Sequence, residues 1–206
     1  DINIHVDDLK KSVKKLSSKK YIFEKEVNNL IEYEKELTNE IFDKLYRQII
    51  LCQRNKGLWS VENINEIILY QNQKISFKNL EEGIPIMCTK NNSELGLSNG
   101  DIGVLIGNSE KRRFLFKIFD DYNKQVIRLI DPSRLENIVP AIAITIHKAQ
   151  GSEAGKVCLL WDKTTNREKK SSLNKKDQNL FFNNNFEKKL FYTAITRAKN
   201  NLDLYY

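Results

Sequence analysis

Apolar residues near the start of the chain recur at helical intervals among Glu and Lys. Between residues 21 and 47 these positions are Phe23, Val27, Leu30, Leu37, Ile41 and Leu45. Neither Pro nor Gly occurs in the first fifty residues. Spacings of three, four and seven residues place such side chains on one face of a helix. The pattern therefore predicts an amphipathic helix over residues 21–47.

A short apolar run, "IILC" at 49–52, predicts a strand, and a second helix is expected after the turn "QRNKG". Ser60 is suited to the N-cap of that helix, because its hydroxyl can accept from a first-turn N–H group. Glu62 would be a favourable first-turn acid. This helix would carry Ile64, Ile67 and Ile68 on one face.

Between about residue 83 and residue 140 the pattern changes to short apolar runs that alternate with turn sequences. The runs are "IPIMC", "IGVLIG", "RFLFKIF" and "QVIRLI", and the turns are "SNGD", "GNSEKR", "DDYNK" and "DPS". This alternation is typical of a small antiparallel barrel or meander. In "SNGD", Asn99 and Gly100 would form a tight turn between strands.

The last third of the chain alternates strands and helices again. Strands are predicted at "AIAIT" (141–145), "VCLLWD" (157–162) and "LDLYY" (202–206), with a helix near 184–199. The polar, basic tract 163–179 is read as a surface loop, either a solvated insertion or a nucleic-acid contact. Strands and helices at both ends, with a β-rich segment between them, predict an α/β domain interrupted by a barrel.

Charge and composition narrow the class of protein only moderately. Lys and Arg number 34 against 27 Asp and Glu, for a net charge of +7, and 40% of the residues are hydrophobic. The chain can thus bury a core, and its basic surplus fits either a polyanionic partner or a merely soluble basic surface. No apolar run reaches membrane-spanning length, and the start "DINIHVDDLKK" is not a signal peptide.

Neither a disulfide framework nor a metal site is expected. The three cysteines, Cys52, Cys88 and Cys158, are far apart, form no CxxC, and are accompanied by only two histidines. They are expected to be reduced core thiols of a cytoplasmic protein.

The stretch "GSEAGKV" (151–157) is similar to a phosphate-binding P-loop but does not satisfy its requirements. Three residues rather than four separate Gly151 from Gly155, and Val157 stands where Ser or Thr must reach the magnesium ion. No G-x-x-x-x-G-K-[ST] occurs elsewhere in the chain. The chain alone is therefore expected not to hydrolyse a nucleotide.

Two segments carry candidate chemistry. The first, "TIHKAQGSE", follows the apolar strand 141–145 with a dense set of polar groups: Thr145, His147, Lys148, Gln150, Ser152 and Glu153. The second is the final predicted helix, whose apolar face comprises Phe186, Leu190, Phe191, Ala194, Ile195 and Ala198. Arg197 would lie on the opposite face, as a held cation suited to phosphate or as a solvated side chain.

These two segments resemble motifs V and VI of superfamily 1 helicases. The matching stretches are "AIAITIHKAQGSE" (141–153) and "LFYTAITRAKNNLDL" (190–204), and the branch that they resemble is RecD-like, the exodeoxyribonuclease V alpha chain. Residues 50–68 resemble the motif IV region. Residues 83–105 resemble the segment that enters a small SH3-like barrel in these proteins.

The resemblance implies a second RecA-like (P-loop NTPase-like) motor domain formed by residues 1–83 and 140–206, with a helical lead-in at 1–48. An SH3-like barrel would be inserted at 84–139. The first RecA-like domain, with the Walker A lysine, would lie upstream, and ATP with Mg²⁺ would be bound mainly there. The chain would then be the C-terminal portion of a longer helicase, inactive as an isolated fragment.

The resemblance also implies roles for single residues. Thr145, His147 and Lys148 would contact DNA, whereas Gln150, Gly151 and Glu153 would face ATP. Arg197 would reach the γ-phosphate and act in catalysis. Arg54 is a further candidate for ATP and Asn99 for DNA.

Simpler readings of the same residues stay open. His147 could be a hydrogen-bonded residue at a helix start, and Glu153 could pair with Lys156. Ser152 is best read as a local cap, and Asn99 could serve only its turn.

The function implied is that of an ATP-dependent DNA helicase or translocase of a recombination and repair nuclease. Its partners would be single-stranded and duplex DNA and other subunits of an exodeoxyribonuclease V complex, with no membrane. The sequence also fits two alternatives. One is a stand-alone nucleic-acid-binding module, and the other is a subunit-interaction domain without motor activity.

Overall fold

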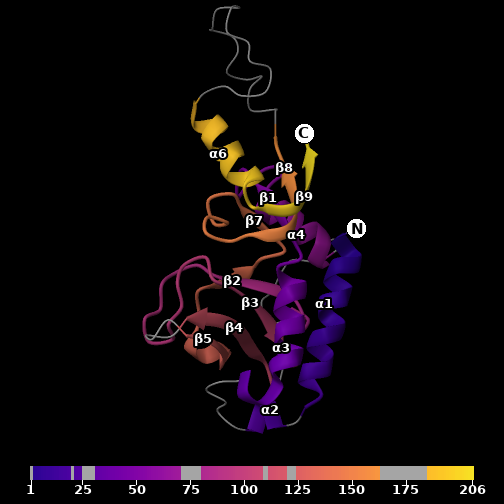
Figure 1. Cartoon of the computed structure of the whole chain (residues 1–206), viewed down its shortest axis with the longest axis vertical. Helices are drawn as coiled ribbons and strands as arrows, with labels where there is room; N and C mark the ends of the chain where they lie inside the picture. The colour runs from indigo at the N-terminus through magenta and orange to yellow at the C-terminus, as the bar shows by residue number, and fades with distance from the viewer. Residues whose placement is uncertain are drawn as a thin grey trace, which may run out of the picture. The chain divides into compact units, whose positions relative to one another are not determined.

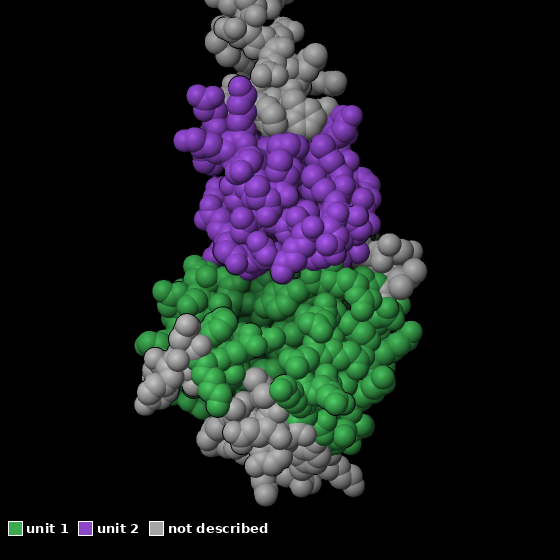
Figure 2. Space-filling view, in the orientation of Figure 1, with its two compact units in different colours: residues 1–47, 65–142 green, residues 48–64, 143–206 purple. Residues whose placement is uncertain are grey.

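The computed structural model describes residues 2–19, 21–24, 31–70, 80–108, 111–119, 124–162 and 185–206. The chain forms two compact units, which Figure 2 colours separately. Unit 1 comprises residues 1–47 and 65–142, and unit 2 comprises residues 48–64 and 143–206. The domain boundaries implied by the resemblance, at 83/84 and 139/140, stay a prediction. The basic tract 163–179 lies outside the described residues.

Unit 1 contains a five-stranded antiparallel sheet (Figure 1). Its strands are β2 (Pro85–Cys88), β3 (Ile102–Ile106), β4 (Arg113–Phe119), β5 (Gln125–Ile130) and β6 (Ile138–Pro140), in the order β5-β4-β3-β2-β6. A 3₁₀ turn, η2 (Pro132–Arg134), joins β5 to β6. Among the described residues no ladder pairs β5 with β6, so a closed SH3-like barrel stays a prediction.

The tight turn before β3 is confirmed. The Asp101 N–H donates to the Ser98 carbonyl at 3.1 Å, and Gly100 has a φ of +103°. Residues with a side chain rarely adopt this backbone conformation, whereas glycine does so without steric cost.

Unit 1 also contains the helices α1 (Ile2–Ser17), α2 (Tyr21–Glu24) and α3 (Ile31–Leu45), together with the last residues of a helix that begins in unit 2. In α1 the residues spaced by three or four positions are buried, namely Val6, Leu9, Val13 and Leu16. The predicted lead-in is thus helical, but the single helix over 21–47 is wrong. Glu34 has non-helical torsion angles (φ −139°, ψ 48°), and Val27 and Leu30 lie outside the described residues.

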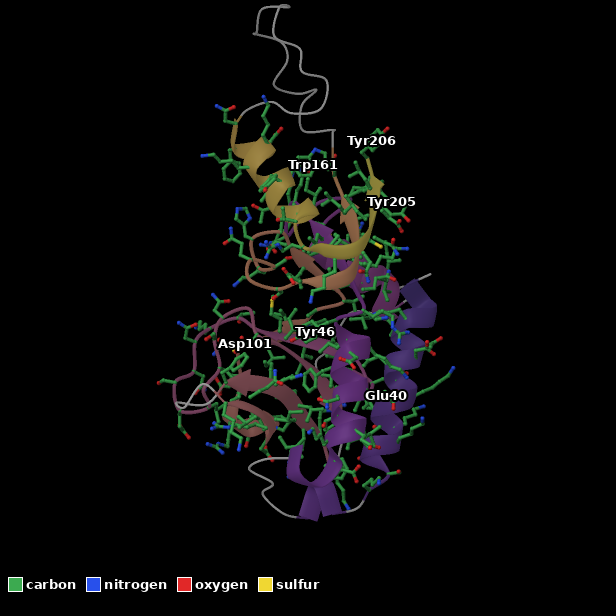
Figure 3. All side chains as sticks on the ribbon, in the orientation of Figure 1. Glu40, Tyr46, Asp101, Trp161, Tyr205 and Tyr206 are labelled. Carbon is green, nitrogen blue, oxygen red and sulfur yellow. The ribbon has the colours of Figure 1, made fainter. Side chains whose placement is uncertain are left out.

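A polar network joins α1 to α3 and contains Glu40 (Figure 3). The Ser12 hydroxyl donates to Glu40 Oε1 at 2.7 Å, and Lys44 Nζ donates to Glu40 Oε1 at 2.8 Å and to Ser12 Oγ at 2.6 Å. These hydrogen bonds, from Lys44 first and Ser12 second, hold the pKa of Glu40 below its ordinary value.

Unit 2 is built on a four-stranded parallel sheet in the order β7-β1-β8-β9 (Figure 1). The strands are β1 (Gln48–Cys52), β7 (Ala143–Thr145), β8 (Ala154–Leu160) and β9 (Ala198–Tyr205). Continuous apolar runs suit central parallel strands, because both of their faces are covered. The two sheets and their helices make the chain a mixed α/β protein with a parallel sheet, as predicted.

The three cysteines are buried and unbridged. Cys52 lies in β1, and burial raises the pKa of its thiol to about 12. Cys88 ends β2, and Cys158 lies in β8.

Two helices follow strands of the parallel sheet, α4 (Val61–Tyr70) and α6 (Asn185–Ile195). The predicted N-cap of α4 is confirmed, because Asn63 N donates to Ser60 Oγ at 3.2 Å. Ile64, Ile67 and Ile68 share one face of α4 as predicted, but this face is not fully buried, since Ile67 is 59% exposed while Asn65 is buried. None of the described helices is long and apolar enough to span a membrane.

The helix α6 packs on β8 and β9 through Leu190 and Ala194, its buried residues. Trp161, labelled in Figure 3, lies just beyond the end of β8. The Phe191 ring meets it edge-on at 5.1 Å between centroids. This arrangement is a favourable one for two aromatic rings. It anchors the helix that precedes Arg197.

Candidate functional site

Residues 146–153, which we name the crossover loop, connect β7 to β8. The loop runs from the carboxyl ends of the parallel strands back to their amino ends. Thr145 ends β7 opposite Cys52 of β1, whereas Gln48 of β1 pairs with Lys156, two residues after the start of β8. Because the strands point the same way, the loop must return from their carboxyl ends to their amino ends. At about 3.3 Å per residue the two ends of the loop are ~20 Å apart along the strands.

At the carboxyl edge the loop begins with a tight turn. The Thr145 carbonyl accepts from the N–H groups of Lys148 at 3.0 Å and Ala149 at 3.2 Å. Thr145 Oγ1 accepts a longer bond from Lys148 N at 3.4 Å. The Thr145 side chain is only 8% exposed, and its hydroxyl hydrogen is not used in that bond. The turn leaves His147 exposed.

The His147 ring stacks on Phe186, the second residue of α6. The ring centroids are 6.0 Å apart and the planes differ by 26°. Phe186 is 61% exposed, so the expectation that it packs in the apolar face of the final helix is wrong. Its ring lies against the crossover loop instead of the sheet. Sequence spacing alone missed this contact, because an apolar residue at helical spacing was read as core.

At the amino edge the loop meets Arg197. The Arg197 guanidinium donates from Nη1 to the Ser152 carbonyl, from Nε to the Thr193 carbonyl and from Nη2 to Thr196 Oγ1, each at 3.3 Å. The Arg197 carbonyl in turn accepts from Ala154 N at 2.9 Å. Both the side chain and the backbone of Arg197 therefore join the last turn of α6 to the end of the loop.

The sequence predicts that Arg197 lies on the final helix, but in the structure it lies beyond the end of that helix. The helix α6 ends at Ile195, Arg197 N donates to the Ala194 carbonyl in the turn that follows, and β9 already begins at Ala198. The arginine is therefore held by the junction of a helix and a strand. This position fixes its backbone from two sides.

The loop and α6 thus touch at both of their ends. His147 contacts Phe186 near the start of the helix, and Ser152 contacts Arg197 just beyond its end. Two segments forty residues apart in sequence behave as one connected substructure across the sheet.

The remaining candidates of the loop are exposed. Gln150 and Gly151 lie at the surface, and Gly151 has a φ of +87° with open space where a Cβ would be. Glu153 pairs with Lys199 at 3.3 Å, not with Lys156. Lys156 instead binds Asp203 at 2.6 Å, and this hydrogen bond raises the pKa of Lys156.

Arg54 lies at the carboxyl ends of the parallel strands, whereas Arg197 lies at their amino ends. It follows β1, and its Nη1 lies 3.9 Å from Asp162 Oδ2, just after β8. The Asp162 N–H donates to Gln53 Oε1 at 3.0 Å. The two arginines that the resemblance directs to ATP are therefore not brought together within unit 2.

Asn99 belongs to unit 1, and its backbone N–H donates to Asn91 Oδ1 at 2.7 Å. This bond supports the turn that carries Gly100. The role of Asn99 in the turn is thus visible, whereas a contact with DNA stays a prediction.

Comparison with curated proteins finds relatives over most of the chain. The chain is 30% identical over 186 residues to the RecBCD enzyme subunit RecD of Buchnera aphidicola subsp. Schizaphis graminum, covering 84% of this chain and 27% of that protein. It is 29% identical over 164 residues to RecD of Haemophilus influenzae (77% of this chain, 21% of that protein). It is 35% identical over 117 residues to RecD of Mycolicibacterium smegmatis (57% and 17%). No protein-family model matches the chain.

Among solved structures, the chain is similar to Bacteroides Pif1 bound to ssDNA, with a TM-score of 0.44 and 17% identity over 76% of this chain and 40% of that chain. It is also similar to the Pif1 helicase from Candida albicans, with a TM-score of 0.33 and 18% identity over 59% and 30% of the two chains.

The resemblance to the RecD-like branch is confirmed, because the curated relatives over most of the chain are RecD subunits. The similarity is consistent with a RecD-like C-terminal helicase fragment. It spans about a quarter of the length of the curated relatives that it matches.

Proposed function

We propose that this chain is the C-terminal portion of an ATP-dependent DNA helicase or translocase. In this proposal unit 2 is the core of a second RecA-like motor domain, and the antiparallel sheet of unit 1 corresponds to the inserted SH3-like barrel. ATP with Mg²⁺ is held mainly by an upstream domain. Single-stranded DNA, duplex DNA and further subunits of an exodeoxyribonuclease V-type complex are the partners, in the cytoplasm.

One observation carries the proposal: the motif V loop and the motif VI arginine are physically joined. The crossover loop begins beside Thr145, presents His147 at the carboxyl ends of the strands, and reaches Arg197 through Ser152 at their amino ends. A short loop that connects two ligand sites can couple nucleotide hydrolysis to movement of a strand, provided that both ligands bias its conformation.

The surroundings of Arg197 suit an anion. All three of its acceptors are neutral, two carbonyls and one hydroxyl. Within the described part of the chain, Arg197 forms no ion pair with a carboxylate, whereas the Nη1 atom of Arg54 lies 3.9 Å from Asp162 Oδ2. A guanidinium without a counter-charge can bind phosphate oxygens through two parallel hydrogen bonds. Arg197 is therefore the residue assigned to the γ-phosphate and to catalysis.

The assignments at the loop follow the same geometry. At the DNA side, the exposed His147 ring is available to a phosphate backbone, and Lys148 adds positive charge. Thr145 is largely buried and would have to become more exposed to donate its hydroxyl hydrogen to the same backbone. At the nucleotide side, Glu153 can accept a hydrogen bond from a ribose hydroxyl if its ion pair with Lys199 breaks when the ligand binds. Gln150 and Gly151 are exposed beside it, and the open space at Gly151 permits close approach.

The test is steady-state ATP hydrolysis, with saturating single-stranded oligonucleotide, by the full-length polypeptide that carries this segment. Arg197→Ala should lower the rate about 10³-fold or more, since removing a cation that stabilises phosphoryl transfer has effects of that order. Arg197→Lys should restore little, because an ammonium lacks the planar fork of a guanidinium. Lys188→Ala, an exposed cation on α6, is the matched control and should hydrolyse ATP normally.

Circular dichroism and strand binding should be unchanged in the Arg197 variants. Near-normal turnover by Arg197→Ala would mean that this arginine is only a structural link. The 206-residue chain alone should fold without hydrolysing ATP. DNA-stimulated turnover by the pure chain would contradict the assignment of the Walker A lysine to another domain.

A further inference from the structure

Phe186 is a largely exposed aromatic residue near the start of α6. The helix is anchored by Leu190, Ala194 and Phe191, whereas 61% of the Phe186 surface remains exposed beside His147. The only ring contact recorded for Phe186 within the described residues is the stack on His147.

The two rings form a surface with a definite shape. A centroid distance of 6.0 Å and an angle of 26° describe an offset, nearly parallel pair. Since one side of the Phe186 ring faces His147, its exposed surface extends this aromatic pair into the solvent. We name the two residues the aromatic platform.

Two lysines are close to the platform in sequence. The half-buried Lys148 follows His147 in the crossover loop, and the exposed Lys189 lies one helical turn after Phe186 on α6. An exposed ring in such a basic segment matches a ligand that has flat apolar rings and a negative backbone. Single-stranded nucleic acid has both, and aromatic side chains in basic surfaces bind its bases by stacking.

We propose that the aromatic platform stacks on a nucleobase of the single-stranded DNA that the crossover loop binds. Phe186 then becomes a DNA-binding residue, and His147 contributes the face of its ring as well as its N–H groups. Because every base has a π face, this contact tolerates any sequence. The inference rests on the proposed function and adds to it a base contact from the motif VI helix.

The experiment uses the full-length polypeptide that carries this segment and two fluorescein-labelled probes. One is an oligonucleotide of about a dozen thymidines, and the other has the same phosphodiester backbone with abasic sites in place of the bases. Anisotropy titrations compare the wild type with Phe186→Ala, Phe186→Leu and Phe186→Trp. Tyr192→Ala is the matched control, because Tyr192 is 66% exposed on the same helix.

Phe186→Ala and Phe186→Leu should each weaken binding of the thymidine probe by about tenfold, and Phe186→Trp should retain it. Binding of the abasic probe should be the same in all variants. Thymidine replaced by 5-iododeoxyuridine should photocrosslink to the peptide that contains Phe186 in the wild type.

Three outcomes would overturn the inference. If Phe186→Ala leaves thymidine binding unchanged, the platform serves another partner, such as an apolar protein surface. If it weakens both probes equally, Phe186 acts on the backbone contacts or on the fold and not on a base. If the wild type binds neither probe, the DNA-binding role in the proposed function fails and the inference fails with it. Binding of both probes by the wild type separates the first two outcomes from the third.

Discussion

Unit 1 and unit 2 differ in what their polar and aromatic side chains contact. In unit 1, Ser12, Glu40 and Lys44 bind one another between two helices, and Phe114 and Phe116 of β4 are fully buried. In unit 2, His147 and Phe186 are exposed, and Arg197 is held by neutral oxygens. These side chains of unit 1 contact one another, whereas those of unit 2 leave binding capacity along one loop and one helix. Such capacity is where ligand binding is expected.

The strongest test of this contrast replaces one phenylalanine in each unit. Phe116→Ala should lower the free energy of unfolding by about 3–5 kcal/mol, because it leaves a cavity in the core. Phe186→Ala should change it by less than about 0.5 kcal/mol, as surface substitutions do. Urea unfolding followed by circular dichroism measures both. A similar loss for the two variants would show that Phe186 is structural.

Two glycines with positive φ give a second matched pair. At Gly107 (φ +76°) an added Cβ would lie 2.2 Å from the Lys111 carbonyl oxygen and 2.9 Å from the Phe23 ring, so the backbone must shift. At Gly151 (φ +87°) nothing lies within 4 Å. Gly151→Ala should cost about 1 kcal/mol of conformational strain, and Gly107→Ala about 3 kcal/mol, since the clash adds to the strain.

Thermal unfolding of both glycine variants provides the measurement. Equal shifts in Tm would indicate that the crossover loop is as closely packed as unit 1. In that case the space assigned to a ligand beside Gly151 would be absent.

The smallest expected effect concerns two carboxylates. The folded pKa of Glu40 is lowered, so its network stabilises the protein at neutral pH and loses that contribution as the pH falls through and below about 4. Glu40→Gln should cost less than about 1 kcal/mol at pH 7, because the side chain is partly exposed, and should flatten the decline in stability toward acid. Glu153→Gln, at an exposed ion pair, is the control.

Urea midpoints between about pH 7 and pH 3 test this pair. If Glu40→Gln has the same pH dependence as the parent chain, the network between α1 and α3 contributes nothing through ionisation.

Much of the fold was predictable because its cues are local. Buried runs such as "IILC" and "VCLLWD" became parallel strands, and "SNGD" became the turn before β3. The final helix was predicted too long, since its apolar spacing continues to Ala198 without a Gly or Pro to mark its end. The backbone instead turns at Arg197 and enters β9, whose pairing with β8 is decided by tertiary contacts.

The candidate site was predictable in residue types but not in layout. The motif resemblance predicts that Thr145, His147 and Arg197 contact ligands. It did not show that the two ends of the crossover loop lie at opposite edges of the sheet, because strand order and register are long-range properties. The stack of His147 on Phe186 was missed for the same reason, since it joins residues that are far apart in sequence.

The discontinuity of unit 2 has a consequence for biosynthesis. Its first strand, β1, ends at Cys52, and the partner β7 begins at Ala143, so residues 53–142 are translated between them. All the strands of the antiparallel sheet leave the ribosome before β1 can find a parallel neighbour. Long-range parallel pairing of this kind is slow and leaves apolar segments open to aggregation. The nascent chain is therefore most prone to aggregation after "QIILC" has been synthesised and before β7 and β8 are available to pair with it. A chaperone would protect the chain most during that interval.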